Sequence, residues 1–162
     1  MNLNMFFPRR EDRRRAEAAK VWQEAARLFS FQEIPDLSGN THVLWAHLPL
    51  DGNCSLSVQA GEYVEFEALQ NHEHLLDDLT QEEFHAMLPV TDGLCRALRN
   101  VLSVRYPDRT FHVWGLVQEG GTVIVRFYQD WPDEAEYWTD DMQIDENREK
   151  LIHYKTGGNT NG

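Results

Sequence analysis

The chain has 162 residues, of which 41% are hydrophobic, and its formal net charge is -12. That length suits a single domain with one hydrophobic core, and the apolar content argues against global disorder despite the charge. No run of about 18 apolar residues occurs, so we expect no membrane-spanning helix. The first residues lack the order of a secretory signal, and two cysteines form no disulfide framework. We therefore expect a cytoplasmic protein.

Charge is distributed unevenly along the chain. Residues 1–30 contain seven Arg or Lys and four acids, whereas residues 31–162 contain eight basic and 23 acidic residues. Neither Lys nor Arg occurs between Phe31 and Cys95, where there are twelve acids. Such a field repels nucleic acid and anionic membranes and attracts basic molecules. We therefore expect a basic protein partner, and no binding to nucleic acid or membranes.

The first predicted elements are a helix and a strand. Apolar residues at three- and four-residue spacing predict a helix over 9–30. A loop over 36–40 follows, and the apolar segment 41–48 then predicts a strand.

Two further strands are predicted over 55–59 and 62–69. In the second, Tyr63, Glu65 and Glu67 alternate with apolar residues, which is the pattern of a half-buried strand. The segment 70–78 has no clear periodicity.

The middle of the chain contains helix signals. The segment Thr80-Gln-Glu-Glu83 has the sequence of a capping box and predicts a short helix over 81–88 that ends at Pro89. A second helix is predicted from about residue 91 to about residue 106, because apolar side chains recur on one face.

The clearest strands are 111–117 and 122–129. They flank Gln118-Glu-Gly-Gly121, a turn sequence that predicts a β-hairpin.

A last helix is expected over 145–154, and a flexible tail over 155–162. The order of elements predicts one α+β domain over residues 1–154. Its antiparallel sheet would have about four or five strands, with the helices packed mainly on one face.

No motif in the chain indicates catalysis or a bound metal. The segment His72-Glu-His74, with Asp77, Asp78 and His85 nearby, offers zinc-ligand residue types, but the spacing matches no metal template. The sequence contains no GxSxG, Walker A or GxGxxG motif. We expect no catalytic residue, no metal and no cofactor, and therefore no enzyme.

The segment 127–138 is the strongest candidate for a binding site. It contains five aromatic residues and four carboxylates but no base. Tyr and Trp are frequent anchors in interfaces, and the carboxylates would form a rim for Lys or Arg of a partner. Alternatively, Phe127, Trp131 and Trp138 cover the open edge of the hairpin. The predicted partner-binding residues are Tyr128, Asp130, Trp131, Asp133, Glu134, Glu136, Tyr137 and Trp138. A secondary acidic surface would comprise Glu65, Glu67, Asp77, Asp78 and Glu82.

In architecture and charge the chain resembles the small acidic immunity proteins of bacterial toxin systems. The shared features are a compact α+β domain, acidic stretches without a base, and a hairpin over 111–129 that leads into Asp130-Trp-Pro-Asp-Glu134. The resemblance implies a protein that binds a cognate basic toxin, often a nuclease, and blocks its active site or an adjacent surface. The Arg-rich stretch 9–15 departs from a uniformly acidic pattern and leaves open a toxin that is not a nuclease.

Two alternatives stay open on the sequence. A small enzyme or small-molecule-binding protein would need a pocket of histidines and carboxylates, such as His42 or His47 with His112. An adaptor subunit of a larger assembly would use the helix over 9–30 to project Val21 and Trp22 outward.

Overall fold

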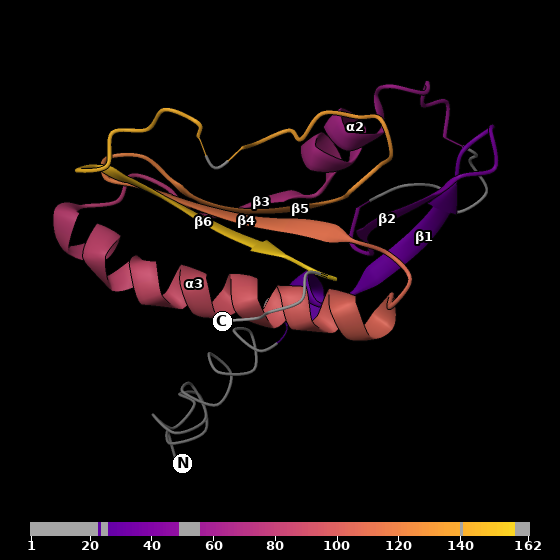
Figure 1. Ribbon diagram of the computed structural model, residues 1–162. Coiled ribbons are helices and arrows are strands. Elements are labelled where there is room, and N and C mark those ends of the chain that lie inside the picture. Colours follow the sequence, from indigo (N-terminus) through magenta and orange to yellow (C-terminus); the bar gives the residue numbers. More distant parts are fainter. Residues whose placement is uncertain (1–22, 24–25, 49–55, 140, 158–162) are drawn as a thin grey trace, which may run out of the picture.

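The structure is a computed structural model (Figure 1), and it describes residues 23, 26–48, 56–139 and 141–157. Within these residues six strands form one two-stranded and one four-stranded sheet, both antiparallel, which confirms the predicted α+β class. The small sheet consists of β1 (Phe31–Pro35) and β2 (Thr41–Trp45). The large sheet has the order β3-β5-β4-β6 and consists of β3 (His72–Leu76), β4 (Phe111–Gln118), β5 (Val123–Gln129) and β6 (Glu149–Lys155). The described residues also form the helices α2 (Tyr63–Gln70) and α3 (Gln81–Arg105).

The long helix α3 lies along one face of the large sheet (Figure 1). Cys95, Leu98 and Leu102 of this helix are fully buried against apolar side chains of the sheet. Gly115 of β4 permits the close approach, because a Cβ there would lie 2.8 Å from both the Cys95 Sγ and the Thr91 Cγ2. The helix and the sheet therefore enclose the main core of the protein.

The opposite face of the large sheet is covered by α2 and by the chain between β5 and β6 (Figure 1). Side chains alternate along a strand, so Val113 faces α3 whereas its neighbour Trp114 faces the other way. Trp114 and Tyr128 are fully buried there against Val64 and Ala68 of α2. This second face carries the segment that the sequence marks as a binding site.

The hairpin prediction is confirmed, and so is the capping box. β4 and β5 pair from Phe111↔Gln129 to Val117↔Val123. At the start of α3 the Thr80 hydroxyl accepts a hydrogen bond from the Glu83 backbone N–H, and the Glu83 carboxylate accepts one from the Thr80 N–H.

Three element predictions are wrong. Residues 62–69 form helix α2 instead of a strand, because Tyr63, Val64, Glu67 and Ala68 are buried together at helical spacing. The two predicted helices are one, since α3 continues through Pro89. The predicted helix over 145–154 is wrong because residues 149–155 pair with β4 as strand β6.

Some predictions fall partly outside the described residues. Most of the helix predicted over 9–30 lies there, with Val21 and Trp22, although residues 26–28 are helical. Of the strand predicted over 55–59, the described residues contribute only an isolated bridge from Leu56 to Asp36. The fold extends past residue 154, because Thr156 is buried and its hydroxyl accepts a hydrogen bond from the Phe111 N–H. Residues 158–162 of the predicted tail lie outside the described residues.

Among the described helices, none is long and apolar enough to span a membrane.

Candidate protein-binding site

Arg126 of β5 anchors the aromatic end of the candidate segment. Its guanidinium carbon lies 4.5 Å from the ring centre of Tyr137 and 4.4 Å from that of Trp138, and the residue is 6% exposed. Its Nε and Nη1 have no hydrogen-bond acceptor among the described residues. The aromatic ring faces therefore supply the electrostatic compensation for this buried cation.

Tyr128 fixes the same segment from inside. It is fully buried, so it is not a surface residue as the sequence suggested. Its hydroxyl accepts a hydrogen bond from the Trp114 indole N–H at 3.1 Å and donates one to the Trp138 carbonyl at 3.2 Å. Burial raises the pKa of this phenol above its ordinary value. Tyr128 thus holds the backbone of the segment from the interior and is not accessible to a partner.

Glu134 has an internal role too. Its two carboxylate oxygens accept hydrogen bonds from the backbone N–H groups of Gly61, at 3.0 Å, and Val64, at 2.8 Å. Glu62, at the N-cap position of α2, makes no side-chain cap. Glu134, from a distant part of the chain, supplies that cap. A negative charge at this end of α2 is also favoured by the helix dipole. Its carboxylate is therefore occupied within the fold.

The remaining carboxylates of the segment, Asp130, Asp133 and Glu136, are exposed. Asp130 forms an ion pair with Lys155 at 2.8 Å, and the Glu136 carboxylate lies 3.6 Å from the His112 Nε2. Asp133 has a φ of 66°, in the left-handed region that Asp and Asn tolerate better than most residues. The segment thus presents its charges outward while its aromatic side chains face the sheet.

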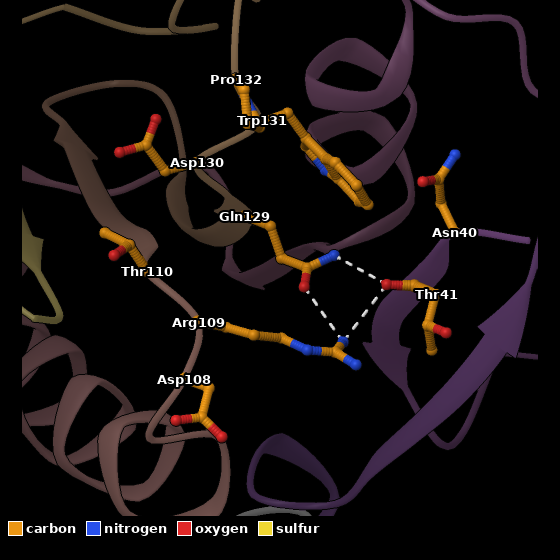
Figure 2. Close-up of a pocket in the computed structure, with 9 residues that line it drawn as sticks. All are labelled: Asn40, Thr41, Asp108, Arg109, Thr110, Gln129, Asp130, Trp131 and Pro132. Carbon is orange, nitrogen blue, oxygen red and sulfur yellow. Dashed lines mark hydrogen bonds between the residues drawn. The ribbon is translucent and has the colours of Figure 1, made fainter.

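The half-buried Trp131 connects the segment to a groove between the two sheets. Its ring lies 4.9 Å from that of Tyr63 and 5.2 Å from that of His42. Figure 2 shows the groove, with Trp131 on one side and Asp108 and Asp130 at its edge. Its volume is about 440 Å³.

Arg109 forms part of the floor of this groove (Figure 2). Its guanidinium donates hydrogen bonds to the Thr41 carbonyl at 3.2 Å, to the Gln129 Oε1 at 3.1 Å and to Glu33 at 3.3 Å. This cation is therefore already paired within the fold. The groove also contains the Trp131 ring and the carboxylates of Asp108 and Asp130, which are groups that attract a cationic side chain.

A buried hydrogen-bond network lies behind Trp131. Glu67 of α2 accepts hydrogen bonds from the Gln129 backbone N–H at 2.6 Å and the Gln129 Nε2 at 2.5 Å, and its Oε1 is 2.9 Å from the His42 Nδ1. On the other side of His42, its Nε2 lies 3.6 Å from the Asp36 carboxylate. Glu67 and His42 are fully buried. The prediction that Glu67 belongs to an acidic surface is therefore wrong, since its carboxylate joins α2 to β5.

Asp36 is a paired carboxylate in the same network. Burial works to raise its pKa, but hydrogen bonds from the Asn40 side chain and from the Asn40 and Ser38 N–H groups outweigh that effect. The pKa of Asp36 is consequently below its ordinary value.

The other members of the predicted secondary acidic surface are exposed, and they lie in two separate regions of the fold. Glu65 lies on α2, whereas Asp77, Asp78 and Glu82 lie around the connection from β3 to α3. The Asp77 carboxylate is 3.5 Å from the His74 Nδ1.

The histidines proposed for an alternative pocket do not converge on the groove of Figure 2, whose lining contains none of them. His42 belongs to the buried network, His47 pairs with Glu73, and His112 stacks between Tyr128 and His153. In the described part of the chain no three His, Cys, Asp or Glu side chains are grouped to hold a metal ion. Burial raises the pKa of the Cys95 thiol to about 12, which makes it a poor nucleophile near neutral pH.

The sequence singled out the segment but gave no indication that Arg126, Arg109 and Gln129 hold it and the groove beside it in place. One signal was available, because Arg126 is the only Lys or Arg in the hairpin 111–129 and directly precedes the aromatic segment.

No family model, no curated protein and no solved structure matches this chain.

Proposed function

We propose that this protein binds a positively charged protein partner through the exposed carboxylates Asp130, Asp133 and Glu136. The observation that carries the proposal is the way the segment is held. Its aromatic side chains pack around Arg126 and against the sheet, while these three carboxylates remain exposed. Charges on a preorganised surface lose little conformational entropy on binding, and they attract cations before contact.

Within that class we favour an inhibitor of the immunity type, which would neutralise a basic toxin in the cytoplasm. Carboxylates held on a firm surface can occupy a site that otherwise binds phosphates, as in a nuclease. The low content of bases supports this choice, since no Lys or Arg occurs between Phe127 and Asn147. Lys155 pairs with Asp130, so Asp133 and Glu136 contribute most of the field of the segment.

The test removes charge without changing shape. We expect Asp133→Asn combined with Glu136→Gln to weaken binding of the cationic partner about tenfold, since each exposed ion pair contributes roughly 0.2–1 kcal/mol. Asn is chosen at 133 because it tolerates the left-handed backbone. To identify the partner, carbodiimide is used to couple the protein to proteins in extracts of the native cell, and mass spectrometry identifies the one joined to Asp133 or Glu136. That protein is then purified, and its binding is measured by titration calorimetry.

Asp78→Asn combined with Glu82→Gln is the matched control. Asp78 is the other described non-glycine residue with a positive φ, 57°, and both residues are exposed, so the control removes the same charge from a comparable backbone. The proposal requires the control to bind nearly as well as the unmodified protein. If both pairs of substitutions weakened binding equally, the effect would come from net charge and not from the position of the charges. If carbodiimide coupled the partner only to other carboxylates, the assigned site would be wrong.

A further inference from the structure

A second groove lies beside α2 and differs in chemistry from the groove of Figure 2. It has a volume of about 380 Å³, and its apolar lining comes from Leu56, Val58, Phe66 and Leu69. Leu69 is 45% exposed although it is a large apolar residue. Leu37, 73% exposed, is tied to the same region because its N–H donates to the Leu56 carbonyl. Apolar side chains therefore gather on an open, concave surface.

The rim of this groove is acidic. Glu62 and Glu65 line it, both are exposed, and the surrounding sequence from Phe31 to Cys95 has no Lys or Arg. Half-buried Leu56, Val58 and Phe66 thus lie beside exposed carboxylates. A binding hot spot has a similar arrangement, in which an anchor side chain is desolvated and the charged rim stays in water. The negative charge of this rim favours Lys and Arg on the molecule that binds.

The groove and the site of the proposed function both adjoin helix α2. Glu134, next to Asp133, accepts hydrogen bonds from the N–H groups of Gly61 and Val64, which flank Glu62 at the start of α2. The acidic segment is thus fastened to the helix that forms the groove. Both sites thus border α2, and the exposed charged residues of both are acidic.

We propose that this groove binds apolar side chains of a partner segment in which they are flanked by Lys or Arg. The inference rests on the proposed function, because it assigns the anchor site of the same cationic protein partner. Carboxylates on the rim pair with the flanking cations, and burial of the apolar side chains supplies the affinity that exposed ion pairs lack.

Three synthetic peptides of equal length test the inference on the full-length protein. The first contains lysines with leucines at every third or fourth position, the second has the leucines replaced by serine, and the third keeps the leucines but has glutamate in place of lysine. We expect the Lys/Leu peptide to bind about tenfold tighter than the Lys/Ser peptide, because burial of one Leu side chain has about that effect on affinity. Backbone amide shifts in two-dimensional NMR should then change at Phe66 and Leu69.

Leu69→Ser should abolish the advantage of the Lys/Leu peptide, whereas Val104→Ser should retain it. Val104, 83% exposed, lies on α3 and is the matched control for loss of an exposed apolar side chain. Equal affinity for the Lys/Leu and Lys/Ser peptides would overturn the anchor site while leaving the acidic segment as a charge-recognition site. Binding of the Glu/Leu peptide as tightly as the Lys/Leu peptide would overturn the role of the rim. If neither lysine peptide bound, the proposed function itself would fail.

Discussion

Glu67 shows at the scale of one residue how a charge can serve the interior instead of the surface. It is one of twelve acids in a stretch of sequence without a base, yet it is fully buried and its two oxygens receive hydrogen bonds from Gln129. A buried carboxylate is tolerated only when such donors replace its hydration. Its side chain therefore links α2 to the strand that leads into the acidic segment.

Replacement of Glu67 by leucine should destabilise the protein by about 3 kcal/mol, because the buried Gln129 N–H and the His42 ring lose their partner. Glu67→Gln should destabilise the protein less than the leucine substitution, since the amide oxygen still accepts hydrogen bonds. The free energy of unfolding from urea titration, followed by tryptophan fluorescence, checks both values. Glu65→Leu on the exposed side of the same helix is the control, with an expected change of about 0.5 kcal/mol or less. Equal effects of the two leucine variants would contradict the importance of the buried network.

At the scale of elements, α2 explains why part of the fold could not be predicted. The alternation of polar Tyr63, Glu65 and Glu67 with apolar residues indicates a strand only if every charged residue is solvated. Because Glu67 is buried by long-range partners, the true burial pattern is helical and the polarity pattern is misleading. The hairpin was predictable, in contrast, because its turn and its strands are adjacent in sequence.

Distant contacts also explain the other two errors. Phe84 and Leu88 pack with Val117 and Val123, so the first part of α3 stays helical through Pro89 despite the lost hydrogen bond. Residues 149–155 have a charged, helix-compatible composition, but seven residue pairs with β4 make them a strand. For the candidate site, the acidic and aromatic composition was visible in the sequence. Which side chains turn inward depended on the position of Arg126, which only the fold reveals.

The contact between α3 and β6 predicts a pH dependence. The Tyr154 hydroxyl of β6 donates a 2.7 Å hydrogen bond to the Asp92 carboxylate of α3, and this bond, together with Arg96, holds the pKa of Asp92 below its ordinary value of 3.8. A carboxyl with a lowered pKa contributes stability above its unfolded pKa, and that contribution is lost as the pH falls through the folded pKa. Tyr154→Phe should therefore be destabilising at pH 7, and its difference from the unmodified protein should shrink below about pH 4.

Urea unfolding between neutral and strongly acidic pH measures this difference. Tyr128→Phe is a suitable comparison, because the Tyr128 hydroxyl bonds to an indole and a backbone carbonyl that do not titrate. Its destabilisation should stay nearly constant over the same acidic range. A Tyr154→Phe difference that is equally constant would show that Asp92 does not couple these two elements.

At the scale of the whole molecule, the charge of -12 has two opposite consequences for the effect of salt. Repulsion among like charges disfavours the compact state, so screening should stabilise the fold. The attraction of a cationic partner is screened by the same ions, so binding should weaken. The two effects share one cause and can be measured on one sample.

We expect the midpoint of thermal unfolding to rise by about 2–4 °C between low salt and roughly 0.2 M NaCl. In a domain of this size, that shift corresponds to an increase of about 1 kcal/mol in the free energy of unfolding. Over the same range the affinity for a lysine-rich peptide should fall. Calorimetry in NaCl, repeated in choline chloride to separate screening from specific ion binding, measures both. Neutralisation of Asp78, Glu82, Asp133 and Glu136 together should flatten both salt dependences. A midpoint that falls with salt would mean that attractive ion pairs within the chain outweigh repulsion. The outward field would then be too weak to recruit a cationic partner.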